Sequence, residues 1–147
     1  MRDMRSNKQV VHLGNVSLSG VTPAASAWVD TKGFDACTIV LVNNTITDAG
    51  TADGFTVTMQ HSDTTAAADA AAVVAADSVD GNISIQVTAD NADDALGGGL
   101  GYKGSKRYVR FNGVGTTGTN ADVSVVAILN KPHRAETTFV GTKVAAT

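Results

Sequence analysis

Apolar and polar residues alternate along much of the chain with a period of two, the pattern that places one face of a strand on a core. The clearest stretches are 27–30, 38–42, 55–61, 83–88, 107–111 and 123–129. Each is short, and turn-forming residues such as Gly33, Asn43-Asn44 and Gly81 separate them. Strands of this length and spacing are typical of a β-sandwich, jelly roll or small barrel. We therefore predict an all-β fold of one of these kinds.

Two segments interrupt this alternation. Residues 66–76 are rich in alanine, which favours a helix, but they show no amphipathic stripe. We expect at most a short helix there, beside an irregular or extended connection. The segment from Asp90 to Gly101 contains three consecutive glycines and is predicted to be a long flexible loop.

The two ends of the chain differ from its middle. The 147 residues fit one domain. Residues 1–20 and the tail after Pro132 mix basic, polar and isolated apolar residues. We therefore predict an N-terminal arm (1–20), a sandwich domain (21–132) and a C-terminal tail (133–147). Such arms either stay disordered or become ordered by docking on a neighbour.

Composition indicates a thin core. Hydrophobic residues make up 43% of the chain but aromatic residues only 5%. Small side chains bury little area each, at about 25 cal/mol per Å², so contacts with partner subunits would add needed stability. Cys37 has no intrachain partner for a disulfide, and we find neither a signal peptide nor an apolar run of membrane-spanning length. We expect synthesis in the host cytoplasm and no membrane partner.

Charge is unevenly distributed, although the net charge is only −3. The stretch from Gly33 to Tyr102 lacks Lys and Arg and holds ten of the 14 acidic residues, whereas all 11 basic residues lie in the flanks. This division favours layered contacts between a basic patch and an acidic surface. The alternative, that each sign simply solvates its own loops, is equally compatible with the sequence.

Motifs for metal binding or catalysis are not apparent. The three histidines lie far apart, without the spacing of a zinc site: His12, His61 and His133. His61 continues the alternation of Val57 and Met59, which predicts a structural histidine, and Cys37 is predicted to be a small core residue. We therefore predict no enzyme activity, no catalytic residue, no metal and no cofactor.

Two short motifs resemble ligand-binding sites but lack the neighbouring structure or the spacing that such sites need. Gly99, Gly101 and Gly104 match G-x-G-x-x-G, but the following residues predict a strand where a dinucleotide site needs a helix. The aspartates at 90, 93 and 94 do not have the spacing of an EF-hand loop. We interpret them as a solvated acidic loop.

Nucleic-acid binding has one argument in its favour, because basic residues surround aromatic ones between residues 102 and 111. Alternation places Tyr108 and Arg110 on one face but Arg107, Val109 and Phe111 on the other, so the rings would not form one platform. The pI of 5.4 also disfavours a phosphate partner. The sequence therefore disfavours nucleic acid as a partner.

Three pieces of the chain resemble a known group. They are Trp28 to Phe34, Met59 to Asp63, and Gly101 to Phe111 with its Gly-Tyr-x-Gly-x-Lys-Arg-Tyr stretch. In this order and spacing they are similar to the cement or decoration proteins of tailed bacteriophage heads. The likeness spans roughly residues 29–132. The alanine-rich segment 66–76 and the tail beyond Pro132 depart from it.

The resemblance implies a jelly-roll-like sandwich on the capsid surface of the virion, which binds the major capsid protein and ties neighbouring capsid subunits together. It implies a homotrimer first and a dimer second, and no catalytic residues. Our candidate capsid or subunit contacts are Arg2, Arg5, Lys8, Val10, Lys106, Arg107 and Arg110. For the last three, ordinary cross-strand pairing is an equal alternative. A carbohydrate- or nucleic-acid-binding module using Trp28, Tyr102 or Tyr108, and a tail or neck component, are the competing functions.

Overall fold

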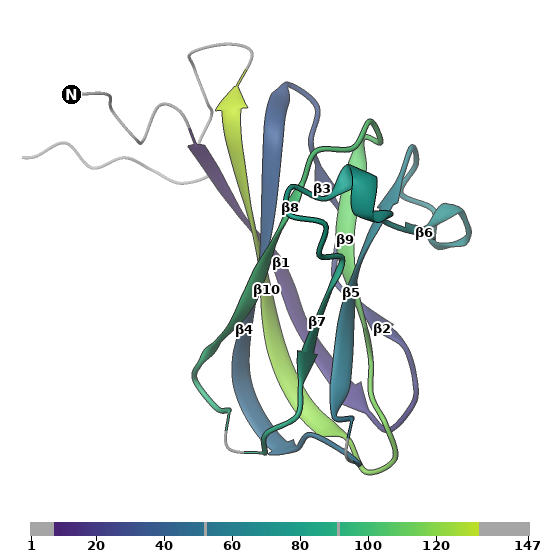
Figure 1. Cartoon of the computed structure of the whole chain (residues 1–147), viewed down its shortest axis with the longest axis vertical. Coiled ribbons are helices and arrows are strands. Elements are labelled where there is room, and N and C mark those ends of the chain that lie inside the picture. The colour runs from purple at the N-terminus through teal and green to yellow at the C-terminus, as the bar shows by residue number, and fades with distance from the viewer. Residues whose placement is uncertain (1–7, 52, 91, 133–147) are drawn as a thin grey trace, which may run out of the picture.

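The computed structural model describes residues 8–51, 53–90 and 92–132, which form two antiparallel sheets packed face to face (Figure 1). Sheet A has the order β1 (Lys8–Ser19), β10 (Asn120–Pro132), β4 (Phe34–Asp48) and β8 (Leu96–Tyr102). Sheet B has β9 (Tyr108–Val114) and β5 (Phe55–Ser62) at its centre. Short strands flank this pair: β2 (Ala24–Ala25) and β3 (Val29–Asp30) beside β9, β6 (Ala71–Ala72) and β7 (Ser84–Val87) beside β5.

The predicted all-β sandwich is confirmed, whereas the jelly-roll connectivity stays a prediction. The described residues include no helix with the length and apolar character needed to span a bilayer.

The core lies between the sheets and is built from alternate residues of the long strands. On β10 every second side chain from Ala121 to Leu129 is buried, while its neighbours are half-buried. Phe55 and Met59 of β5 and Phe111 of β9 supply the largest buried side chains of sheet B. Cys37 on β4 is 2% exposed, which confirms its prediction as a core residue.

The predicted N-terminal arm is wrong for residues 8–19, which form β1 at the edge of sheet A. β1 pairs with β10 from Lys8 opposite Asn130 to Ser19 opposite Asn120. The register shifts between His12 and Asn15, where Gly14 has a φ of +97° that glycine adopts without strain. This bulge changes the phase of the alternation, which hid the strand in the sequence. Residues 1–7 and the predicted tail 133–147 lie outside the described residues.

The predicted flexible loop at 90–101 is also wrong in its second half, because residues 96–101 belong to β8. Gly99 of β8 pairs with Val40 of β4 and Gly101 pairs with Thr38. Glycines show no alternation, so the strand carried no apolar signal. By contrast, the alanine-rich segment forms two short 3-10 turns, η1 (Ala67–Asp69) and η2 (Ala75–Asp77), on either side of β6. This confirms the expected short helix and extended connection.

Candidate interaction surfaces

Lys106 and Arg107, which precede β9, make ion pairs within the chain. Lys106 Nζ pairs with Asp63. Arg107 binds Asp30 through two hydrogen bonds, from Nε at 3.0 Å and from the terminal nitrogen at 2.6 Å. The Arg107 guanidinium holds the pKa of Asp30 below its usual value, and Asp30 raises the pKa of Arg107. Lys106 and Arg107 therefore have partners within their own chain, as the alternative of ordinary pairing predicted. Both ion pairs are solvent-exposed, so each contributes little to the stability of the fold.

Arg110 of β9 lies over an aromatic ring on the outer face of sheet B. Its guanidinium carbon is 4.3 Å from the centre of the Trp28 ring, and its Nε donates to Gln60 Oε1 at 3.0 Å. Partial burial lowers the pKa of Arg110. These contacts fix the side chain against its own sheet.

The prediction that Arg107 shares a face with Val109 and Phe111 is wrong, because those two residues are buried and Arg107 is not. Its side chain is exposed and lies over the ring of Tyr108, 5.0 Å from the ring centre. Arg107 precedes the first residue of β9, so the alternation of that strand does not extend to it. The outer face of sheet B therefore carries Trp28 and Tyr108 together, each under an arginine.

A buried polar cluster lies between the sheets at the end where β8 stops. His61 Nδ1 is 3.1 Å from the Tyr102 hydroxyl, and the two rings meet edge to face. Asp77 Oδ2 lies 3.8 Å from the same nitrogen, and the Lys106 backbone N–H donates to the Tyr102 hydroxyl at 3.0 Å. Burial raises the pKa of Tyr102 to about 12. The prediction that His61 is a satisfied structural histidine is confirmed.

An open cavity of about 370 Å³ adjoins this cluster and is lined by His61, Ser62, Asp63, Thr64, Asp69, Ala71 and Lys106. Its rim charges are already engaged, since Lys106 binds Asp63 and the Thr64 hydroxyl donates to Asp69. In the described part of the chain, no three His, Cys, Asp or Glu side chains are grouped so that they could hold a metal ion.

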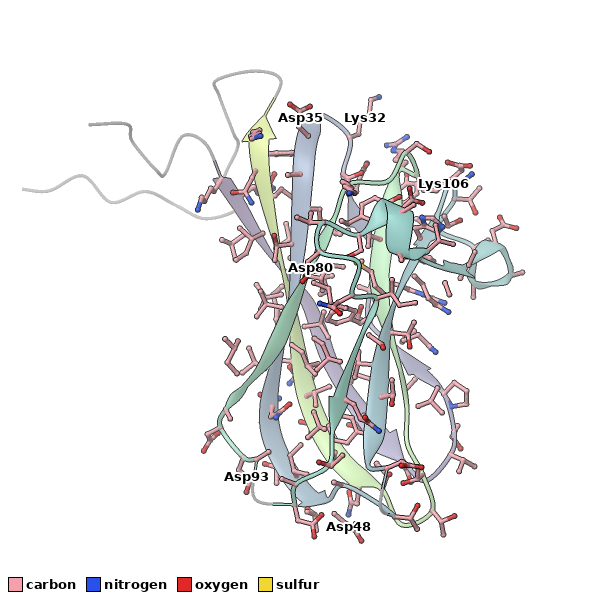
Figure 2. All side chains as sticks on the ribbon, viewed as in Figure 1. Lys32, Asp35, Asp48, Asp80, Asp93 and Lys106 are labelled. Atoms are coloured by element: carbon pink, nitrogen blue, oxygen red, sulfur yellow. The ribbon has the colours of Figure 1, made fainter. Side chains whose placement is uncertain are left out.

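The opposite end of the sandwich is acidic. Figure 2 shows Asp48 and Asp93 at that end and Lys32 and Lys106 at the other. Asp48 accepts the Gly50 N–H at 2.7 Å, and Asp93 accepts the N–H of Ile46. These carboxylates stabilise the loops by accepting hydrogen bonds from backbone N–H groups of the same chain. The acidic residues of this end are Asp48, Asp53, Asp90, Asp93 and Asp94.

Cations gather at the end where β1 begins and β10 ends (Figure 1). The described cations there are Lys8, Lys32, Lys103, Lys106, Arg107 and Lys131. They share this end with several aspartates, including Asp30, Asp35 and Asp63. The described residues thus give the molecule one end that carries both cations and aspartates and an opposite end whose charges are acidic.

Val10, the apolar candidate contact, belongs to an open surface on sheet A. Its side chain is 61% exposed and points away from the core, as do Val126 and Ile128 of β10. Val40 and Val42 of β4 and Leu96 of β8 extend this surface, and Val79 covers the position of Gly101. Sequence reasoning missed all of these except Val10. Arg2 and Arg5 lie outside the described residues.

Comparison with known proteins gives a likeness in fold. No family model matches the sequence, and no curated protein matches it at a significant level. Among solved structures, the chain is similar to the PBSX exported protein XepA, with a TM-score of 0.50 and 14% sequence identity. The match covers 95% of this chain but only 42% of XepA, so the chain spans less than half of that protein. At this identity the likeness concerns the fold alone.

Proposed function

We propose that this chain is a structural protein of a bacteriophage particle that binds the outside of the assembled head and bridges major capsid subunits. The observation that carries the proposal is the charge polarity of the sandwich. Six of the seven described cations lie at the end from which the first strand starts and the last strand leaves, and the described charges of the far end are acidic. A protein built this way orients itself on an acidic lattice with its cation-bearing end inward.

Two further points support the proposal. The sequence resembles the head decoration proteins of tailed phages, and the fold is similar to that of XepA, a PBSX exported protein. The exposed ion pairs of Lys106 and Arg107 each contribute about 0–1 kcal/mol to stability. These two side chains can therefore leave their intrachain partners and bind the capsid at a small cost in free energy. Many weak contacts repeated over a lattice then add up through multivalency. In this role the protein is not an enzyme.

Binding to purified expanded heads tests the proposal. Reversing three exposed cations in K32E/K103E/K131E is expected to weaken binding by about 30-fold or more, at about 0.7 kcal/mol per charge. The matched control is D53N/D94N at the acidic end, which leaves binding within about threefold because those residues face away. Co-sedimentation with heads at several salt concentrations gives both numbers. The proposal would be rejected if the wild-type protein did not bind heads, or if the two variants lost the same amount of binding affinity.

A carbohydrate- or single-strand-binding module is the second candidate, favoured by one observation. Trp28 and Tyr108 share the outer face of sheet B, each with an arginine over its ring. Tyr102 does not contribute, since it is 3% exposed. Trp28 is the only tryptophan. Saturable quenching of its fluorescence by glycans or oligonucleotides would favour this module, whereas head binding leaves the emission unchanged. Immunogold labelling of particles separates a head from a tail or neck location.

A further inference from the structure

We propose that two copies of this protein pair face to face through the outer face of sheet A. The two-fold axis lies in the interface, runs across the strands and crosses β10 near Val126. This face is built from all four strands of the sheet and from the segment beside β8. We call it the apolar face, and its members are Val10, Val40, Val42, Val79, Leu96, Val126 and Ile128. The pairing is independent of whether the protein binds phage heads.

The apolar face is too exposed to be explained as part of the monomer's core. Leu96 is 71% exposed, and Val10 and Val79 are each 61% exposed. These side chains gather with four half-buried aliphatic residues on one side of one sheet. A contiguous apolar surface of this kind marks an interaction site, whereas scattered single residues do not.

The cross-strand register arranges the face in rows. The central row contains Val126 and Val40, with His12 of β1 at one end and Gly99 of β8 at the other. On one side of it lies the row of Val10, Ile128 and the polar Thr38, which ends at Gly101 with Val79 over it. On the other side lies the row of Ser124 and Val42, which ends at Leu96.

A half-turn about the central row exchanges the two outer rows. It places the exposed Leu96 of one copy over the partner's Gly101, a position that the partner's Val79 side chain covers, so that two apolar side chains meet there. The same contact occurs twice in the pair, as two-fold symmetry requires.

Charges at the rim of the face fit the same half-turn. Lys8 lies opposite Asn130, four residues beyond Val126 along β10, and Asp122 lies four residues before Val126. The half-turn therefore brings Lys8 toward the partner's Asp122, again twice. Lys8 lies on β1 and Asp122 on β10, which are neighbouring strands of the sheet. Because such strands are about 4.8 Å apart, the half-turn leaves a sideways offset of this size, which a lysine side chain spans.

The size of the face predicts a modest affinity. Four strands spaced by about 4.8 Å and nine residues that rise about 3.3 Å each give about 550 Å² per copy. The pair then buries about 1,100 Å² in total, at the lower limit for a specific interface. We expect dissociation in the micromolar range, so the pair is observable only at sufficient concentration.

Sedimentation equilibrium from about 1 to 200 µM tests the face, with circular dichroism to verify folding of each variant. Val126→Asp places a charge at the axis in both copies and is expected to weaken association by at least about 30-fold. The matched control is Val74→Asp, because Val74 is 56% exposed but lies outside the apolar face. It is expected to leave association within about threefold.

A charge exchange tests the geometry of the axis. Lys8→Asp and Asp122→Lys are each expected to weaken the pair about tenfold, because like charges then meet twice, and the double variant is expected to recover most of the loss. A monomer at all concentrations would overturn the proposal, and so would a trimer or a dimer insensitive to Val126→Asp. Additive losses without recovery would reject this axis. If Val126→Asp abolished head binding while the wild type stayed monomeric, the face would belong to the capsid contact instead.

Discussion

Removal of one hydroxyl, in Tyr102→Phe, tests how much the buried polar cluster contributes to stability. The ring of Tyr102 is retained in the variant, so apolar packing between the sheets changes little. The hydroxyl is hydrogen-bonded to His61 Nδ1 at 3.1 Å and accepts the Lys106 N–H at 3.0 Å. Both groups lose a partner in a site where Tyr102 is 3% exposed and His61 is 9% exposed.

The expected cost is about 2 kcal/mol. A buried polar group left without a partner costs about 1–3 kcal/mol, and the adjoining cavity gives water access to part of this site. For a chain of 147 residues, 1 kcal/mol corresponds to about 2–4 °C in Tm. Tyr102→Phe is therefore expected to lower Tm by about 4–8 °C.

Urea unfolding followed by circular dichroism measures this cost, with Tyr108→Phe as the control. Tyr108 is half-buried, and its hydroxyl makes no hydrogen bond to a described residue, so the control is expected to cost less than about 0.5 kcal/mol. Burial also raises the pKa of Tyr102 from 10.0 to about 12. The stability that the neutral phenol provides is then present below pH 10 and lost as the pH rises toward 12. Equal costs for the two variants would refute the role of the cluster.

Two further predictions concern the backbone and the core. Gly54→Ala is expected to destabilise the fold by more than about 3 kcal/mol in urea unfolding, because φ is +60° and a Cβ would lie 1.9 Å from the Val87 carbonyl oxygen. Gly81→Ala, with φ of +81° but open space around it, is expected to cost about 1 kcal/mol, and similar values for both would contradict this account. Cys37, whose pKa burial raises to about 12, is expected to react with a thiol reagent at pH 8 only as fast as the protein unfolds. Rapid labelling of the native protein would show that the thiol is accessible.

Alternation predicted the strands in which large inward residues face polar outward ones. Residues 38–42 and 55–61 lie in β4 and β5 as expected, and the role of His61 followed from its place in that alternation. β1 was missed because the bulge at Gly14 shifts its phase. β8 was missed because three of its residues are consecutive glycines. Local patterns fail where the backbone changes register or where a strand lacks side chains.

The pairing of the basic residues could not be read from local sequence at all. Lys106 and Asp63 are 43 residues apart, and Arg107 and Asp30 are 77 residues apart. Their contacts depend on which strands become neighbours and in what register, and many arrangements satisfy the same alternation. The charge division was visible in the sequence. The fold alone shows that the aspartates of the acidic middle divide between the two ends, with Asp35 and Asp63 beside the cations and Asp48 and Asp93 at the far end.

The apolar face did leave a signal in the sequence, in the form of adjacent apolar residues within strands. A strand of a two-layer sandwich turns only one side to the core, so two neighbouring apolar residues place one of them outside. In β10, Val125 and Leu129 are buried while Val126 and Ile128 face outward. In β4, Val40 faces outward opposite Val126, and Val42 faces outward opposite Ser124. An isolated outward valine needs no explanation, but outward aliphatic residues in register on adjacent strands indicate a surface that is covered in the assembled protein.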